Sequence, residues 1–420
     1  MKLGLESMTK LLQALGNPQN KYLKVQVAGT NGKGSVCAFL ESICLAAGIK
    51  TGLTTSPHLI SITERVRING EQITEQRFAE LATRVRQAAE RLVNDGELET
   101  VPTYFEQVTA IALLAFAQAK VKVAVLETGL GGRLDATTAA GAEIAVITRI
   151  DYDHQQYLGD TIEQIAGEKA AIIHSGSKVV IGEQTPELMT LLFSRCAEFG
   201  ITPRTRCDAE IYAIDTKNCS MVMTFRTEDE LYFDPDLGLP GRHQIENARI
   251  AILASESLRF DLGTDIEPDD VVEGLENARH PGRLEFQGRY LFDGAHNVGG
   301  AKALRAFLDE FVDKPITMIF GAMQDKDVAE IGKILFPKAD LLILTKPKNS
   351  RALGANEIAD AASSEIADKP VVLTNSVAEA VGEVEKRSTP DAIILITGSL
   401  YLVGEAKKLL EERSAAGGGL

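Results

Sequence analysis

The sequence lacks the features of a membrane or exported protein. It has no apolar run near the roughly 20 residues that a spanning helix needs, and the segment from Met1 to Glu6 lacks a signal-peptide core. Five cysteines are present without CxxC spacing, which argues against a zinc site or a disulfide framework. We therefore expect a cytoplasmic protein with reduced thiols and no membrane partner.

Positive charge is also in short supply. The 44 lysines and arginines are outnumbered by 59 aspartates and glutamates, which gives a formal net charge of −15. This balance disfavours binding to nucleic acid or to an acidic membrane surface. Any anionic small-molecule substrate must therefore be held by a few local lysines and arginines against a repulsive background.

No internal repeat is visible, and the 420 residues exceed one ordinary hydrophobic core. Apolar residues make up 45% and charged residues 25% of the chain, a usual balance for a globular protein. We expect two domains, residues 1–280 and 285–420, because Pro281-Gly282-Arg283 interrupts the pattern between them.

Strands alternate with helices in the first half, which predicts a mostly parallel sheet covered on both faces. Short alternating runs from Glu210 to Asp234 predict antiparallel strands at the edge of this domain. The expected parallel strands are Val25–Val27, Lys50–Thr55, Val121–Leu126, Ile144–Ile150 and Lys178–Ile181. The expected helices are Leu5–Leu15, Ser35–Ala47, Thr74–Val93, Tyr104–Ala119, 161–173 and His243–Phe260.

The second half predicts a smaller, Rossmann-like α/β domain with its own core. Its expected strands alternate with helices and lie at Tyr290–Phe292, Ile316–Phe320, Leu341–Leu344, Val371–Leu373 and Ile393–Thr397.

A glycine-rich stretch, Gly29-Thr30-Asn31-Gly32-Lys33-Gly34-Ser35, lies between the first strand and a helix. Strand, glycine-rich turn and helix form the arrangement that cradles phosphate, because backbone N–H groups and the helix N-terminus face the anion. Lys33 adds a point charge. The alternative is a turn that merely joins the strand to the helix, but three glycines and a lysine together favour phosphate binding.

Two polar side chains follow neighbouring buried strands of the same predicted sheet. Glu127 comes just past one strand and His154 past the next. Ligands bind outside the carboxyl ends of such strands, so both side chains are expected near the phosphates and could hold Mg²⁺. A loop histidine and a capping carboxylate are the alternatives. The segment from Asp293 to Asn297 likewise follows the carboxyl end of a strand, the first strand of the second domain.

Lys169 lies on a helix next to Glu168. An exposed, salt-bridged lysine is the simplest interpretation, and its chemistry alone gives no reason to assign it a function.

Taken together, these motifs resemble the folylpolyglutamate synthase/dihydrofolate synthase family within the Mur ligase superfamily. The phosphate loop matches, and the match extends in order through most of the chain. The further matching segments are Thr55–Leu59, Glu64–Val66, Gly129–Thr137, Asp153-His154, Glu168–Ala170, Pro281–Glu285, Asp293–Asn297 and Thr397–Tyr401.

The resemblance implies an ATP-dependent ligase that joins L-glutamate to folates, and also to dihydropteroate, through an acyl phosphate. It implies a monomer with two Mg²⁺ ions and a monovalent cation. By motif, the nucleotide residues are Thr30, Asn31, Gly32, Lys33, Gly34, Ser35, Asn247, Arg283 and Asp293. The metal residues are Ser56, Glu127, His154 and a carbamylated Lys169, and the catalytic residues are Lys33, Lys169 and His296. The pterin or folate residues are Thr103, Tyr104, Phe105, Glu106, Leu134, Asp135 and Ala136.

Carbamylation of Lys169 requires a neutral amine, whereas a free lysine with a pKa near 10.4 is almost wholly protonated at neutral pH. We therefore expect nearby Mg²⁺ to favour the anionic product.

The resemblance leaves three questions open. Thr138 and Val298 stand where the family usually has asparagine and proline. The family's usual N-terminal segment does not precede Gly4-Leu5-Glu6, so either that wall of the pterin pocket is absent or the recorded start is internal. The dihydrofolate synthase activity is therefore undecided. The second question is whether the chain is instead a cell-wall Mur ligase. Such an enzyme would need a further N-terminal domain before residue 29. A nucleotide-binding regulator without catalysis is the third reading, although retention of Glu127, His154 and Lys169 argues against it.

Overall fold

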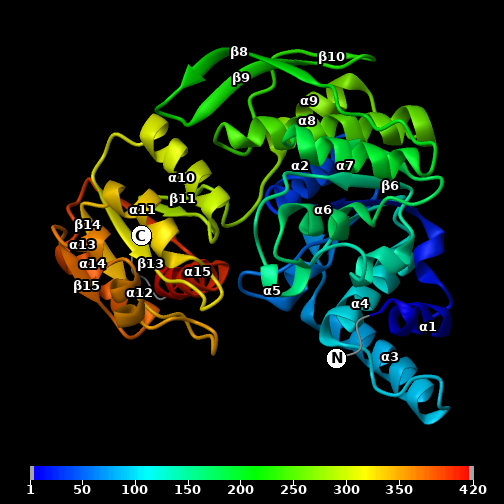
Figure 1. Ribbon diagram of the computed structural model, residues 1–420, viewed down its shortest axis with the longest axis horizontal. Coiled ribbons are helices and arrows are strands. Elements are labelled where there is room, and N and C mark those ends of the chain that lie inside the picture. Colours follow the sequence, from blue (N-terminus) through cyan, green and yellow to red (C-terminus); the bar gives the residue numbers. More distant parts are fainter. Residues whose placement is uncertain (1–3, 416–420) are drawn as a thin grey trace. The chain divides into compact units, whose positions relative to one another are not determined.

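The computed structural model describes residues 4–415, which form two compact units (Figure 1). The first unit contains the residues up to Ala213 together with 221–238 and 244–279. The second contains the residues from His280 onward together with the short segments 214–220 and 239–243. Each unit is built around its own sheet.

The first unit contains a seven-stranded sheet in the order β4-β3-β2-β5-β1-β6-β7. Strands β2, β5, β1, β6 and β7 run parallel, and β3 and β4 add an antiparallel hairpin at one edge. The parallel strands are almost entirely buried, as expected when helices cover both faces of a sheet. Their bounds are β1 (Leu23–Ala28), β2 (Thr51–Thr54), β3 (Arg67–Ile68), β4 (Glu71–Gln72), β5 (Val123–Glu127), β6 (Ile144–Ile147) and β7 (Lys178–Ile181).

The helices of this unit begin and end where local chemistry dictates. Thr103 caps α4, and Glu106 reaches back to the Thr103 N–H, so both ends of a capping box are satisfied. Lys120 ends that helix in the left-handed conformation with φ 57°. The helices are α1 (Glu6–Ala14), α2 (Lys33–Ala46), α3 (Glu75–Asn94), α4 (Tyr104–Ala119), α5 (Gln155–Leu158), α6 (Ile162–Ala170), α7 (Pro186–Ala197), α8 (His243–Glu256) and α9 (Pro268–Asn277). Helices α5, α7 and α9 were not predicted.

The antiparallel strands expected at the edge of the domain form a sheet of their own. Strands β8 (Asp208–Asp215), β9 (Ser220–Arg226) and β10 (Leu231–Tyr232) pair in the order β10-β9-β8, and β9 and β10 lie over α8 and α9 (Figure 1). At the β7 edge of the main sheet, the residues that the structure describes make only an isolated bridge, between Arg204 and Val180. The Arg204 N–H donates to Val179 O at 2.8 Å, and Ile181 N–H donates to Arg204 O at 3.0 Å.

The second unit contains a six-stranded sheet in the order β11-β12-β16-β13-β14-β15, parallel except for β11. The mostly parallel α/β architecture of both sheets confirms the predicted fold class. The strands are β11 (Glu285–Gln287), β12 (Tyr290–Phe292), β13 (Ile316–Phe320), β14 (Leu341–Leu344), β15 (Val371–Leu373) and β16 (Ile393–Thr397). The helices are α10 (Val298–Phe311), α11 (Val328–Leu335), α12 (Ala355–Ala361), α13 (Ser363–Ile366), α14 (Val377–Arg387) and α15 (Leu400–Ala415).

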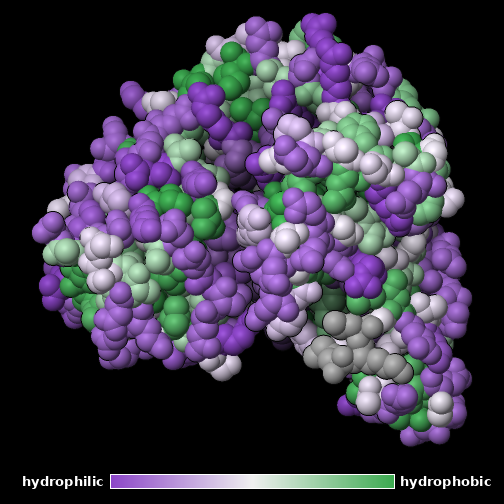
Figure 2. All heavy atoms as spheres, viewed as in Figure 1, coloured by the Kyte–Doolittle hydropathy of each residue, from purple (hydrophilic) through white to green (hydrophobic). Residues whose placement is uncertain are grey.

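Hydrophilic residues cover most of the face seen in Figure 2. Among the described residues, no helix has both the length and the apolar character to span a membrane.

Candidate nucleotide-binding site

The glycine-rich stretch folds as a tight loop between β1 and α2. Gly32 has φ 88°, and a Cβ placed there would lie 2.2 Å from Asn247 Oδ1, so only glycine fits without strain. Asn247 of α8, which the resemblance assigns to the nucleotide, therefore lies beside the loop. A Cβ on Gly29 would lie 1.8 Å from Thr148 Oγ1. Helix α2 begins at Lys33, two residues before the predicted start, so Gly34 and Ser35 lie in its first turn.

The remaining loop residues are fixed to the segment after β6. The N–H groups of Thr30 and Asn31 donate to Arg149 O at 2.8 and 3.2 Å. The Thr30 hydroxyl donates to Asp151 O at 2.9 Å, and Thr148 donates to Asn31 O at 2.8 Å. The loop is therefore held in shape by the protein itself.

Two lysines converge on this loop. Lys33 Nζ donates to the carbonyl oxygens of Gly29 and Thr30, both at 3.1 Å. Lys169 Nζ, from α6, donates to the same Gly29 oxygen at 2.8 Å. Two amines sharing one carbonyl oxygen lie close together, which opposes simultaneous protonation of both.

Lys169 is not the exposed, salt-bridged residue that its neighbours suggested. Its side chain is 4% exposed, and the adjacent Glu168 carboxylate instead accepts a hydrogen bond from Arg133 Nε at 2.8 Å. Burial, reinforced by the charge of Lys33, lowers the pKa of Lys169 to about 7, although Asp153 and Asp135 act in the opposite direction. A substantial fraction of this amine is therefore neutral near pH 7, whereas a free lysine is almost wholly protonated there.

The predicted metal residues lie on both sides of the loop. Glu127 is the last residue of β5, and its Oε2 accepts the Ser56 N–H at 2.9 Å. His154 follows β6 at a longer interval than expected, because β6 ends at Ile147, and it has φ 50° at the start of α5. Strand β1 separates β5 from β6. The expectation that Glu127 and His154 follow neighbouring strands is therefore wrong, and they flank the strand of the phosphate loop.

The oxygen atoms that these residues offer are the kind of ligand with which proteins usually bind Mg²⁺ beside a nucleotide. Glu127 and Ser56 offer oxygen atoms, whereas Lys169 could contribute oxygen only as a carbamate. Within residues 4–415, no three His, Cys, Asp or Glu side chains are grouped to form a metal cage. A small set of protein ligands is sufficient for Mg²⁺, which keeps several waters and binds substrate phosphates.

The residues expected to border the pterin differ in how their side chains are used. Thr103 and Glu106 are engaged in the cap of α4. Phe105 packs so closely on Gly129 that a Cβ there would lie 2.5 Å from its ring. Tyr104 is exposed.

The loop after β5 is organised by Asp135. Its buried carboxylate accepts the N–H groups of Gly129, Leu130 and Thr137, each at 3.0 Å, and the Thr137 hydroxyl at 2.6 Å. Burial raises the pKa of Asp135. Ala136 is also buried. Of the three residues assigned to the pterin or folate in this loop, Leu134, Asp135 and Ala136, the half-buried Leu134 is therefore the most accessible.

Sequence analysis assigned no role to a small cluster beside Tyr104. Arg65 Nε donates to His58 Nδ1 at 2.9 Å, and its guanidinium lies 5.8 Å from the centre of the Tyr104 ring. Burial and the charge of Arg65 lower the pKa of His58. Both residues occur in matching motifs, but nothing in their spacing indicated that they meet.

In the second unit, Arg283, Asp293 and His296 gather at the carboxyl end of β12. Asp293 accepts the N–H groups of Leu284 and Ala295 at 3.0 and 2.9 Å. Burial raises its pKa, while the charge of Arg283 opposes this change. A Cβ on Gly294 would lie 2.9 Å from Arg283, and His296 Nδ1 donates to Gly294 O at 2.7 Å.

Both units match known protein domains. Residues 27–255 match the Mur ligase middle domain, and residues 282–400 match the Mur ligase, glutamate ligase domain. A Bacillus subtilis dihydrofolate synthase/folylpolyglutamate synthase is 35% identical over 98% of this chain and 96% of its own length. The corresponding Mycobacterium tuberculosis protein is 33% identical over 96% of this chain and 89% of its own length.

Solved structures agree with these sequence matches. The M. tuberculosis folylpolyglutamate synthase complexed with ADP and AMPPCP has a TM-score of 0.88 and 32% identity, covering 97% of this chain and 95% of that one. E. coli FolC in complex with DHPP and ADP has a TM-score of 0.86 and 28% identity, covering 99% of this chain and 94% of that one.

Proposed function

Because the chain belongs to the folylpolyglutamate synthase/dihydrofolate synthase family of Mur ligases, which are ATP-dependent ligases, we propose that it joins L-glutamate to the carboxylate of reduced folates. Dihydropteroate is proposed as a second acceptor. The observation that carries this proposal is the convergence of Lys33 and the buried amine of Lys169 on one carbonyl of the phosphate loop.

We assign ATP binding to the loop and the first turn of α2. The N-terminus of α2 carries a positive partial charge, and Lys33 supplies a full one, so both attract the triphosphate. Asn247 contacts the loop at Gly32 and is assigned to the nucleotide. Arg283 and Asp293 are the assigned nucleotide contacts of the second unit.

Two Mg²⁺ ions, when bound, would neutralise the triphosphate and help orient the phosphoryl group. Glu127 and Ser56 are proposed to hold the first ion. His154 and carbamylated Lys169 are proposed to hold the second. A monovalent cation is a further proposed ligand.

The position of Lys169 favours carbamylation. Its neutral amine attacks CO₂, a nitrogen–carbon bond forms as one carbon–oxygen π bond breaks, and a proton leaves to solvent, so a neutral amine becomes an anion with two oxygens. Burial supports this change because it disfavours the protonated amine. The product would stand beside the cationic Lys33.

The proposed ligation has two steps. A carboxylate oxygen of the folate attacks the γ-phosphorus of ATP, the bond to ADP breaks, and an acyl phosphate forms. The glutamate amine then attacks the acyl carbon and loses a proton, and the tetrahedral intermediate expels phosphate. Lys33 would stabilise charge on the phosphoryl oxygens. His296 is proposed to position the phosphate or the acyl phosphate.

Phosphate release with matched substrates tests this proposal. The protein would be supplied with ATP, Mg²⁺ and L-glutamate, and with either tetrahydrofolate or dihydropteroate. We expect release that requires both glutamate and the acceptor. A nucleotide-binding regulator would give none, and a cell-wall Mur ligase would respond only to a nucleotide-linked muramyl substrate. Turnover with tetrahydrofolate alone would restrict the activity to folylpolyglutamate synthesis.

A further inference from the structure

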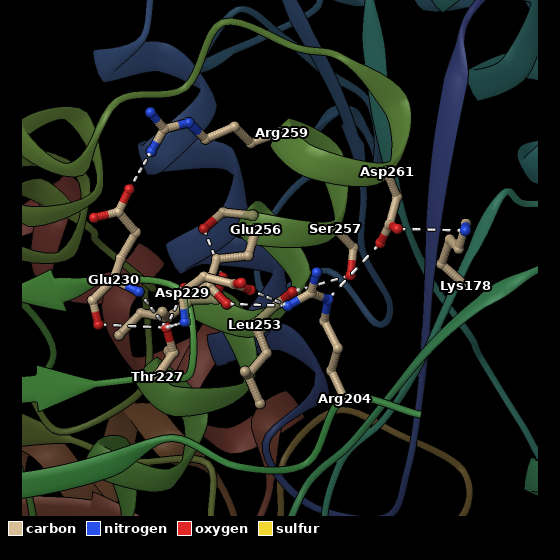
Figure 3. Close-up of polar contacts among 12 residues, drawn as sticks. Lys178, Arg204, Thr227, Asp229, Glu230, Leu253, Glu256, Ser257, Arg259 and Asp261 are labelled. Atoms are coloured by element: carbon tan, nitrogen blue, oxygen red, sulfur yellow. Dashed lines mark hydrogen bonds and ion pairs between the residues drawn. The ribbon is translucent and has the colours of Figure 1, made fainter. Parts of the chain in front are cut away.

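A second candidate site in the first unit is a cavity whose lining contains no residue of the phosphate loop. Several of its charged lining residues are drawn in Figure 3. Its volume is about 690 Å³, within the range of small-molecule sites. It is lined at the amino-terminal start of β7 by Lys178, whereas the phosphate loop belongs to the carboxyl ends of the strands. Arg204 beside β7, the turn between β9 and β10, and the end of α8 complete the wall.

Helix α8 separates the two sites. Asn247, near its start, contacts Gly32 of the phosphate loop. Glu256, its last residue, lines the second cavity. At about 1.5 Å per residue, the two positions are roughly 13 Å apart along the helix. The cavity is therefore distinct from the nucleotide site.

Arg204 is the centre of the charged wall (Figure 3). Its NH1 atom donates to Asp229 Oδ2 at 2.6 Å, and its Nε atom lies 3.7 Å from Asp261 Oδ2. Asp261 also pairs with Lys178 at 3.3 Å. The lining contains four carboxylates, including Glu228 and Glu256, against three cations, so negative charge is in excess.

Glu256 is the least satisfied member of this wall. It is 1% exposed, and its Oε1 accepts hydrogen bonds from Thr227 at 2.6 Å and Tyr232 at 3.0 Å. Its Oε2 lies 3.5 Å from Arg204 and receives no hydrogen bond from the described part of the chain. Burial raises the pKa of Glu256, so the hydroxyls and Arg204 do not fully offset the loss of water. Additional positive charge in the cavity would stabilise this carboxylate.

One part of the cavity wall is apolar. Its apolar lining residues are Val179, Phe199, Ile201, Pro203 and Leu253. A bare metal ion would gain nothing from this wall, and residues 4–415 contain no group of three metal-ligating side chains. An anion would meet the excess of carboxylates. An organic cation with a flat apolar body suits both walls.

We propose that this cavity binds a small organic cation that carries N–H donors on an apolar body, such as an aromatic amine or amidine. The N–H groups bind at Asp229 and Asp261, and the positive charge acts on Glu256 from the cavity side. The apolar body packs on the wall formed around Phe199 and Leu253. This site does not depend on the proposed ligase activity.

Benzamidine is a suitable probe, and benzamide is its neutral counterpart of nearly the same shape. Calorimetric titration into the full chain should show benzamidine binding with an affinity on the order of millimolar, as expected for so small a ligand. Benzamide should bind at least about fivefold more weakly, because it has no charge to interact with the carboxylates.

Asp229→Asn is the main variant, because Asp229 is partly exposed and its replacement should leave the fold intact. It should weaken benzamidine binding about threefold or more, whereas Glu210→Gln, an exposed carboxylate outside the lining, should leave it unchanged. Glu256→Gln should also weaken binding, provided that its circular dichroism spectrum matches the parent. Equal binding of benzamidine and benzamide, no binding of either, or full benzamidine binding by Asp229→Asn would overturn the proposal.

Discussion

Replacing Lys169 with methionine should change how the stability of the first unit depends on pH. The side chain is buried, and its pKa falls from 10.5 to about 7 in the folded protein. Between these values the unfolded chain binds a proton that the folded chain lacks, so the free energy of unfolding rises with pH. Methionine has a similar length and does not titrate.

The magnitude follows from the two pKa values. Below pH 7 the protonated amine costs the folded state on the order of 5 kcal/mol, and this cost disappears as the pH approaches 10.5. From about pH 6.5 to about pH 8.5, the parent should gain about 2 kcal/mol of unfolding free energy relative to Lys169→Met.

Urea unfolding in CO₂-free buffer measures this gain without interference from carbamylation. The transition of the first unit should be followed separately, because a chain of two units need not unfold in one step. The loss of the Lys169 hydrogen bond and any change in packing affect all pH values alike and cancel in the comparison. Identical pH dependence of parent and variant, within about 0.5 kcal/mol, would show that the amine is not desolvated as the structure indicates.

Three further predictions concern the phosphate loop and its lysines. Lys33→Ala should abolish ATP-dependent turnover while the circular dichroism spectrum stays unchanged. The control is Lys50→Ala, which replaces an exposed lysine and should retain turnover. Turnover of Lys33→Ala at the parental rate would contradict the assignment. Gly32→Ala should weaken ADP binding by about tenfold or more, because its Cβ meets Asn247 at φ 88°. Gly48→Ala, also at positive φ but with open space around it, should bind ADP normally, and equal binding by both variants would contradict the argument. Lys169→Ala should have very low activity that acetate partly restores and bicarbonate does not, because no amine remains to be carbamylated; full activity without added acid would contradict a role for the carbamate.

The strands of the second unit could be predicted because each is a short, continuous apolar run. Val371–Leu373 and Ile393–Thr397 have the predicted bounds. Strand β11 was missed because its three residues, Glu285–Gln287, include charged and polar side chains and pair only along one edge. The strands β8, β9 and β10 were expected only as antiparallel strands at the edge of the domain, because the sequence does not reveal that they pair as a separate sheet.

The candidate site was less accessible to sequence analysis than the fold. The phosphate loop has a local signature, since its glycines, lysine and flanking elements are contiguous. The environment of Lys169 has no such local signature, because the carbonyl oxygen that accepts its hydrogen bond, Gly29 O, is 140 residues away in the chain. The contact between Arg65, His58 and Tyr104 likewise depends on how α4 packs beside the segment after β2. Motif resemblance named these positions but gave no physical reason for them.

Transfer of an oxygen isotope tests the central claim most directly. Tetrahydrofolate labelled with ¹⁸O in its terminal glutamate carboxylate would be incubated with the protein, ATP, Mg²⁺ and L-glutamate, and the released phosphate analysed by mass spectrometry. The proposed acyl phosphate requires one labelled oxygen to pass from the carboxylate to phosphate, with the folate extended by one glutamate. Unlabelled phosphate, or no glutamate-dependent product, would contradict the account.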